Sequence, residues 1–293
     1  MNRNIIRWTL ALTLGSLTAW AQTPIDEKRP ANAEVRIEIK NVKGSVRVEA
    51  WDEGAIHVTG TLGKNSERLE FECDGDDAQI EVVIPKKARN VGQSELRVKA
   101  PRGSSLEISS VSGSIEVKDI TGAQELHTVS GSVRVTGGAG EMEAGTTSGS
   151  VNLEGLFTRV RAASVSGSVT VREVRGEVEA SAVSGRIDVE GSEVTRAKCE
   201  SVSGGVEFSG SLADNARIEL TTHSGSVNVS VPATTSAHLK ASTFSGSIRN
   251  ELSSAVAERP RYGPGATLET TVGGGSGRIE ARTFSGSVNF RKL

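Results

Sequence analysis

Most of the chain alternates apolar and polar residues with a period of two. The clearest rows follow a recurring Ser-Gly-Ser phrase, as where Val133 and Val135 come two and four residues after Gly131. Alternation of this kind predicts a β-strand that buries one of its faces. No long stretch shows helical periodicity. The pattern therefore predicts an all-β chain built from many short strands.

The glycine of the phrase recurs at an almost constant spacing. Successive positions are 18 residues apart from Gly113 to Gly185, and then 19, 21 and 21 residues apart up to Gly246. A unit this short cannot bury its own apolar row, but units stacked about 4.8 Å apart line one continuous core. We therefore predict a β-solenoid (single-stranded β-helix) with about 18 residues per layer over residues 105–293. An antiparallel sandwich or barrel would not explain the constant spacing.

Each unit is expected to contain two short strands and two corners, and the alternation slips by one residue at one corner. Thr128 belongs to the row before this corner, whereas Val129 is out of phase and is expected to begin the row that continues through Gly131 and Val133. A slip of one residue requires a bulge or a turn of the chain. We expect Gly131 to point inward or to adopt positive φ, with the neighbouring serines stacked outside as hydroxyl ladders.

The segments on either side of the repeats have different patterns. Residues 34–104 contain longer alternating rows without the 18-residue rhythm, and we predict an N-terminal β capping region that blocks further strand addition. Residues 22–33 are predicted to be a polar linker. Residues 251–275 interrupt the repeats and hold the only tyrosine. They are predicted to be either an interaction loop or a cover over the last layers, with Arg259, Arg261 and Tyr262 as candidate contact residues.

Residues 1–21 have the pattern of a secretory signal peptide. Two arginines precede a short apolar run, and Ala19-Trp20-Ala21 matches a cleavage site. The run is too short to span a bilayer, although an uncleaved N-terminal anchor is the competing interpretation. Cleavage would leave Gln22 first and no cysteine for a lipid anchor. We therefore expect an exported chain, periplasmic or extracellular, with no membrane span after signal cleavage.

Charge and cysteine content narrow the choice of partners. The chain has 34 basic and 36 acidic residues. Loss of two arginines with the signal would leave 32 against 36, a net charge of about −4, so we expect no nucleic-acid partner. Cys73 and Cys199 both stand at alternating apolar positions, which favours buried free thiols over a disulfide.

The serines and the acidic turn do not form a recognisable reaction centre. A catalytic serine is a single residue beside a base, whereas serines repeated on every layer form a ladder. No Gly-x-Ser-x-Gly motif is present. Asp74–Asp77 faintly matches a calcium loop, but a hairpin turn explains it better. The sequence therefore predicts no catalytic residues, no cofactor and no metal site.

Several segments carry a resemblance to a known family. Val42–Val48, Pro101–Ile108 running into the phrase at Gly113, and Gly273–Val288 resemble the bacterial β-strand-repeat family of unknown function, often labelled adhesin-like. The resemblance covers nearly all of the mature chain. It implies an exported, right-handed, β-solenoid-like protein of the cell envelope, without catalytic residues to carry over. Members commonly have Asp or Asn after the repeat glycine, where this chain mostly has Ser, so a calcium-binding ladder is not expected.

Three function classes follow from these expectations. The first is a non-enzymatic scaffold or binding (adhesin-like) protein whose solenoid face contacts an envelope polymer, a surface or a protein partner. The second is a polysaccharide-acting enzyme, which needs acids clustered on neighbouring layers; the outward positions after the repeat glycine vary instead, from Glu116 and Arg134 to Asn152. The third is a self-associating rod, which the capping region opposes.

Overall fold

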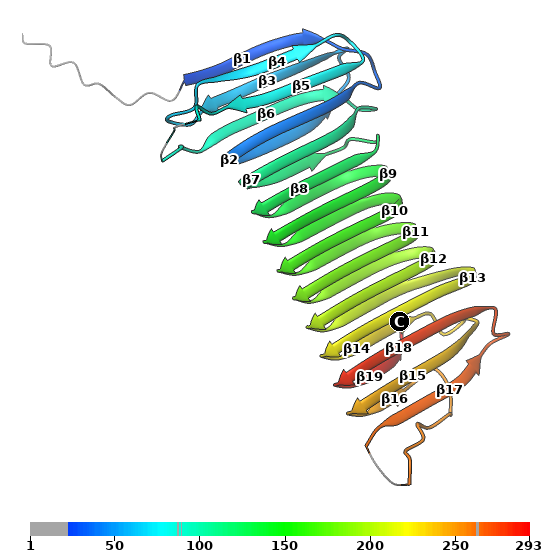
Figure 1. The fold of residues 1–293 in the computed structure, drawn as a ribbon. Helices are drawn as coiled ribbons and strands as arrows, with labels where there is room; N and C mark the ends of the chain where they lie inside the picture. Colours follow the sequence, from blue (N-terminus) through cyan, green and yellow to red (C-terminus); the bar gives the residue numbers. More distant parts are fainter. Residues whose placement is uncertain (1–22, 87, 89, 262–263) are drawn as a thin grey trace, which may run out of the picture.

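The computed structural model describes residues 23–86, 88, 90–261 and 264–293, which form a long stack of strands (Figure 1). All regular structure in these residues is β, and nineteen strands join in one mostly parallel sheet system, consistent with a solenoid-like arrangement. The strands are β1 (Thr23–Pro30), β2 (Arg36–Trp51), β3 (Ala55–Leu62), β4 (Arg68–Cys73), β5 (Asp77–Val83), β6 (Ser94–Pro101), β7 (Ser105–Lys118), β8 (Gln124–Ser130), β9 (Val133–Ser148), β10 (Val151–Ser166), β11 (Val169–Ser184), β12 (Ile187–Ser203), β13 (Val206–Ser224), β14 (Val227–Val231), β15 (Ala237–Ser245), β16 (Ile248–Asn250), β17 (Ala266–Val272), β18 (Gly277–Ser285) and β19 (Val288–Lys292).

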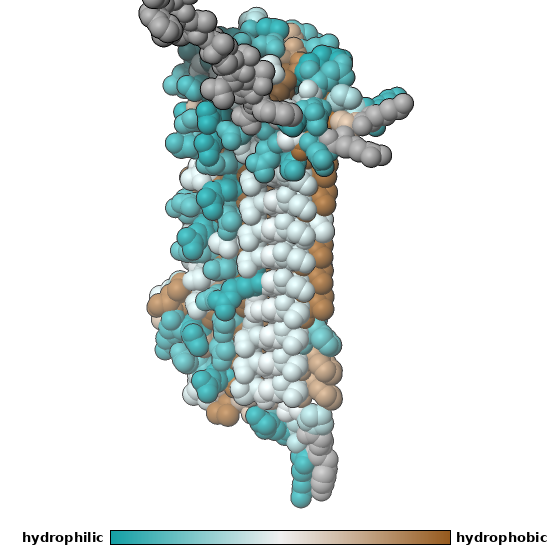
Figure 2. Space-filling model, turned by 90° about the vertical axis from the view of Figure 1, so that its left-hand side faces the viewer, coloured by the Kyte–Doolittle hydropathy of each residue, from teal (hydrophilic) through white to brown (hydrophobic). Residues whose placement is uncertain are grey.

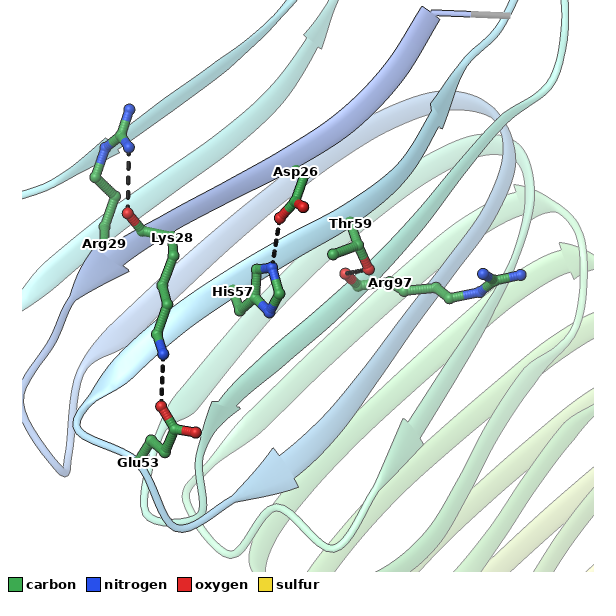
Figure 3. Close-up of polar contacts among 7 residues, drawn as sticks. All are labelled: Asp26, Lys28, Arg29, Glu53, His57, Thr59 and Arg97. Carbon is green, nitrogen blue, oxygen red and sulfur yellow. Dashed lines mark hydrogen bonds and ion pairs between the residues drawn. The ribbon is translucent and has the colours of Figure 1, made fainter.

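The segment expected to be a polar linker, residues 22–33, contains strand β1 instead. β1 pairs antiparallel with β3 along its whole length. Its outward side chains reach partners beside it (Figure 3): Asp26 Oδ1 lies 2.7 Å from His57 Nε2, and Lys28 Nζ lies 2.6 Å from Glu53 Oε2. The polar composition suggested a linker because this strand lies at the edge of the cap, where most of its side chains face solvent.

The N-terminal cap is joined to the stack by β2. Within the cap, β1–β3, β3–β6 and β4–β5 pair antiparallel, whereas β2 pairs in parallel with β5, β6 and β7. β4 and β5 form the hairpin expected around Asp74, whose carboxylate accepts hydrogen bonds from the N–H groups of Asp76 and Asp77. These bonds lower the pKa of Asp74.

The middle of the rod is built from parallel strands in regular register. Val133 pairs with Val151, Val151 with Val169, and Val169 with Ile187, and all four side chains are buried. This confirms the predicted buried row. From β9 to β13 the two short strands expected in each unit form one continuous strand of 16–19 residues. The pairing between layers is interrupted or shifts register in the middle of these strands and is regular on either side. The stacked rows supply the core because each side chain packs against its equivalents in the next layers.

The C-terminal strands do not follow the order of the sequence. β18 lies between β13 and β15, and β19 lies between β14 and β16. The chain therefore builds the outer layer of β15 and β16 first, forms β17 antiparallel to β15, and returns to fill the layer between. Within the predicted loop excursion 251–275, residues 266–272 are strand β17. Figure 1 shows the red β18 and β19 above the golden β15 and β16, with the orange β17 below them.

Both cysteines are free thiols, as the sequence favoured, but only Cys199 is buried. Burial raises the pKa of the Cys199 thiol to about 12. Cys73 is partly exposed, and its Sγ donates to the Pro30 carbonyl at 3.2 Å.

The difference between the two thiols predicts selective labelling. A thiol reagent at pH 8 should modify Cys73 in the native protein and leave Cys199 unmodified, because only a thiolate that the reagent can reach will react. Counting modified thiols by mass spectrometry should give one in buffer and two in denaturant. Modification of Cys199 in the native protein would contradict the packing of β12.

Candidate binding face

One outward side chain per layer forms a row that we call the apolar ladder. The strand register places the rungs next to one another on successive layers, because the residues before the rungs, and in most layers also those after them, are paired with each other. The rungs, in spatial order, are Val42, Val111, Val129, Thr147, Val165, Val183, Val202, His223, Phe284 and Phe244. The apolar rungs are 37–52% exposed. Figure 2 shows the brown stripe running beside pale rows of small residues. Ten rungs at about 4.8 Å span about 43 Å.

Val129 therefore points away from the core, and its expected place in the buried row was wrong. The side chain is 50% exposed, whereas Thr128 before it is 5% exposed. The Thr128 hydroxyl donates to the Gly113 carbonyl of the adjacent layer at 3.0 Å, and Thr146 donates to Gly131 in the same way at 2.9 Å. Because this bond satisfies the hydroxyl inside the corner, the phase slip falls after the valine and leaves it outside.

The repeat glycine is required by the close approach of adjacent layers. A Cβ at Gly131 would overlap the carbonyl oxygen of Gly113 and lie 2.6 Å from its carbonyl carbon. Gly167 has the same relation to Gly149, at 2.5 Å from the carbonyl carbon. Neither Gly131 nor Gly167 has a left-handed φ, so the close approach of the layers alone requires glycine there. The repeat glycines Gly149, Gly204, Gly225 and Gly286 combine the same close approach with a φ of 151 to 157°, so the expected positive φ applies at these layers as well.

In the middle of the rod, the corner hydroxyl is missing from one layer. Ser164 donates to the Gly149 carbonyl at 2.9 Å and Ser201 donates to Gly185 at 3.2 Å, but the equivalent residue between them is Ala182, which is 5% exposed. The Gly167 carbonyl therefore lacks the side-chain hydroxyl that the Gly149 and Gly185 carbonyls receive.

Restoring this hydroxyl should stabilise the rod. Ala182→Thr is expected to raise the free energy of unfolding by about 0.5–1.5 kcal/mol, the net value of one hydrogen bond. Thr146 shows that the corner holds a threonine. Urea denaturation of the variant beside Ala182→Val, which has similar volume and no hydroxyl, isolates the bond. Equal stability of the two variants would contradict this assignment.

A groove runs beside the C-terminal half of the ladder. A cavity of about 340 Å³ is lined by Val165, Val183 and Val202 together with small residues such as Ala163. It meets a second cavity of about 570 Å³ at Ser201, which lines both. The second cavity is closed on one side by the loop after β16. The two cavities form one largely apolar trough along the rod.

Three stacked rings line the wider cavity. His223 and Phe284 have ring centroids 4.9 Å apart, Phe284 and Phe244 have centroids 4.7 Å apart, and both pairs are within 6° of parallel. Phe284 lies between the other two only because β18 is inserted between β13 and β15. The rings stack along the rod axis, so their edges rather than their faces point outward at the end of the ladder.

The predicted loop residues lie at this end of the trough. Arg259 is exposed, and its Nη2 donates to the Gly246 carbonyl at 3.4 Å. Arg261 is exposed on the same loop, and Tyr262 lies outside the described residues. The loop contributes Pro260 and Pro264 to the cavity wall. The structure thus brings the predicted loop to the aromatic rungs, which the sequence analysis did not identify as surface residues.

Another face of the rod carries dense, mutually paired charge. Arg159 lies between Glu141 and Glu177, with nitrogen to oxygen distances of 3.9 and 3.3 Å. Arg161 lies between Glu143 and Glu179 in the same way, at 4.0 and 3.7 Å. These ion pairs run across layers in register. Because the opposite charges on this face are already paired, it offers little net charge to a partner.

The same face places three carboxylates on successive layers. Glu107 pairs in register with Glu125, and Glu125 with Glu143, beside a cavity of about 240 Å³. Sequence reasoning missed this row because it compared the outward positions after the repeat glycine, which lie on another strand face. All three residues are exposed. Within the described ranges, no group of three or more His, Cys, Asp or Glu residues is placed to hold a metal ion.

Membrane-spanning helices were sought in the same part of the chain. In the residues that the structure describes, no helix has the length and apolar character needed to cross a bilayer.

Comparison with known proteins gives a family and several similar structures. Residues 24–216 match the family described as Toastrack DUF4097. A structure described as a putative adhesin from Bacteroides fragilis is 12% identical, with 93% of this chain and 98% of that chain covered and a TM-score of 0.45. A structure described as a putative lipid binding protein from Parabacteroides distasonis is 13% identical, with 92% and 97% covered and a TM-score of 0.47. No curated protein matches the chain.

Proposed function

Because the chain belongs to the toastrack family DUF4097, a family of unknown function, we propose a function from its own surface. The protein is an exported, non-enzymatic binding protein of the cell envelope, and the apolar ladder with its trough is the face that contacts a polymer, a surface or a protein partner. The observation that carries this proposal is the ladder itself. Soluble monomers rarely expose long continuous apolar features, and those that do commonly use them for binding.

The architecture suits such a role. The ladder belongs to a rod whose strands are paired layer by layer, so the rungs keep a fixed spacing without a partner to order them. Preorganised surfaces of this kind bind without the entropic cost of ordering loops. Folding does not require exposed valines, because the polar Thr147 occupies one rung of the same register. Repetition of Val and Phe at the other rungs therefore supports a binding role.

Capture from an envelope preparation tests this proposal. The mature chain should cosediment with an isolated envelope fraction in a saturable manner, and Phe244→Thr should weaken capture because it removes an exposed aromatic rung. Leu156→Thr is the matched control, since Leu156 is 58% exposed but is not a rung. Equal capture of Phe244→Thr and wild type, or a loss for Leu156→Thr alone, would contradict the assignment of this face.

The row of Glu107, Glu125 and Glu143 favours one second candidate, a polysaccharide-acting enzyme. Adjacent layers lie about 4.8 Å apart, close to the carboxyl separation of about 5–5.5 Å in retaining glycosidases. However, all three side chains are exposed, and the apolar enclosure that keeps a general acid protonated is missing. We expect no release of reducing ends from envelope glycans. Turnover that Glu125→Gln abolishes would establish the enzyme instead.

A further inference from the structure

We propose that the apolar ladder is a membrane-contact line, and that the rod lies lengthwise on an anionic lipid bilayer. Its Val and Phe side chains would enter the boundary between headgroups and acyl chains. This inference rests on the proposed function and names the partner of the same face. It draws on three features of the ladder: its shape, the residues beside it and the charges near its rungs.

The shape of the ladder fits a plane better than a globular partner. The apolar rungs form a single row about 43 Å long and one side chain wide. Protein interfaces concentrate their apolar anchors in a central cluster surrounded by a rim, and standard ones use about 20–30 residues on each side. A bilayer surface can contact every rung of a straight row at once. Amphipathic helices use the same principle when they lie in the interface with one apolar face.

The rows beside the ladder are small and mostly uncharged. On one side stand the serines of the repeated phrase, such as Ser130, Ser148 and Ser166, which pair in register. On the other side, the positions two residues before the rungs are small in the middle of the ladder, at Gly145, Ala163 and Ser181, whereas other layers place Lys40, His127, Glu200 and Arg282 there. Small neighbours let the valines protrude, and hydroxyl groups can hydrogen-bond to lipid phosphate and ester oxygens. Approach to the bilayer therefore desolvates few charges.

The few charges near the rungs are mainly positive. Within three residues of any rung along the chain, the charged residues are Lys40, Lys43, Arg186 and Arg282, against the single acid Glu200. The whole chain has the opposite balance, with more acidic than basic residues. Basic groups near an anionic bilayer surface are attracted by about 1 kcal/mol each. The charge near the rungs is therefore complementary to anionic lipid.

These basic residues contribute less to the affinity for anionic lipid than their number suggests. Lys40, Arg186 and Arg282 each also contact a glutamate outside the ladder region: Glu38, Glu207 and Glu280, respectively. The apolar rungs therefore supply the larger part of the affinity, and charge selects the lipid. The aromatic end of the ladder should enter the bilayer more deeply than the valines, because the edges of the Phe284 and Phe244 rings project where the row ends.

The charge pattern also argues against a second copy of the chain as the partner. Antiparallel pairing of two ladders would place Lys40 and Lys43 of one copy near Arg282 of the other. Parallel pairing would place each lysine against its own equivalent. Both arrangements bring like charges together at the interface, which is destabilising. An anionic bilayer surface attracts the same positive charges.

Vesicle cosedimentation tests the inference with variants that keep the fold. The mature chain should bind vesicles of phosphatidylglycerol mixed with phosphatidylcholine, and bind phosphatidylcholine vesicles more weakly. The triple variant Val165→Thr, Val183→Thr and Val202→Thr should bind at least about tenfold more weakly, because three apolar side chains leave the lipid boundary. Thr147 already occupies a rung, so the layers can hold threonine. Thermal unfolding should show that the variant is folded.

Two further variants separate the contribution of the apolar rungs to vesicle binding from that of charge. Leu156→Thr, off the ladder, should bind as wild type does. Lys43→Gln should weaken binding to the mixed vesicles but leave binding to phosphatidylcholine vesicles unchanged, and added salt should mimic it. Vesicle binding that the triple variant retains would overturn the inference, as would no binding to either vesicle.

The failure of this inference can be told apart from failure of the proposed function. One outcome is that the triple variant is no longer captured by the envelope fraction while wild type does not bind vesicles. In that case the face binds a polymer or protein, and the lipid assignment is wrong. If wild type sediments as a dimer that the triple variant dissociates, with no vesicle binding, the partner is a second copy. If neither envelope nor vesicles retain wild type, both proposals fail.

Discussion

Gly167→Ala should destabilise the rod by about 4 kcal/mol or more, the range that reflects a severe steric conflict. The added Cβ would overlap the Gly149 carbonyl oxygen, which belongs to the backbone of the adjacent layer and cannot move aside without breaking the register on both sides. Urea denaturation followed by circular dichroism should show either a much lower midpoint or a chain that does not fold.

Gly205→Ala is the matched control for this prediction. Gly205 stands one residue after a repeat glycine, and a Cβ there would come no closer than 3.4 Å to the Ser226 carbonyl oxygen. We expect a change within about 0.5 kcal/mol. A small effect at Gly167, or effects of equal size at both positions, would mean that the layers do not approach each other as closely as described.

Phe290→Ala should destabilise the C-terminal end by about 3–5 kcal/mol, the usual cost of truncating a buried phenylalanine. Phe290 is fully buried on β19, which pairs with β14 on one side and β16 on the other. Because β19 is an inserted layer, its loss should expose both neighbours. Hydrogen exchange should therefore accelerate in β14 and in β16.

The order of layers decides the outcome of that experiment. If β19 instead followed β16 as an outermost layer, protection would fall in one neighbouring strand alone, and β14 would keep its slow exchange. Phe244→Ala provides the comparison, since Phe244 is half exposed and stacks on one ring. Its cost should be on the order of 1 kcal/mol, without faster exchange in β14.

The regular part of the fold could be predicted from the sequence because one period controls it. The spacing of Gly113, Gly131 and Gly149 determines which residues share a row, and alternation then places Val133 and Val151 inside. The insertion of β18 and β19 could not be predicted, since the phrase at Gly286 matches the register of Gly225 and Gly246 equally well. Identical repeats therefore predict the structure within a layer but not the order in which the layers stack.

The same alternation prevented the prediction of the proposed binding face. Val129 has the period of the valines that follow Gly131, so the pattern assigned it to the core. A buried threonine whose hydroxyl bonds to the adjacent layer reverses that assignment, and single-sequence periodicity does not reveal such a bond. Recurrence of Val or Phe immediately before the serine in most repeats was the available signal. It becomes informative once the corner geometry is known.

The outward direction of the ladder is the central claim, and thiol accessibility at two adjacent residues tests it most directly. In a Cys73→Ser background, Val183→Cys should react with a maleimide at the rate of an exposed thiol, and Ala182→Cys should react at least about a hundredfold more slowly, because burial limits access to the thiolate. Vesicles or envelope fraction should protect Val183→Cys. Fast reaction at Ala182→Cys with slow reaction at Val183→Cys would place the valines in the core and contradict the account.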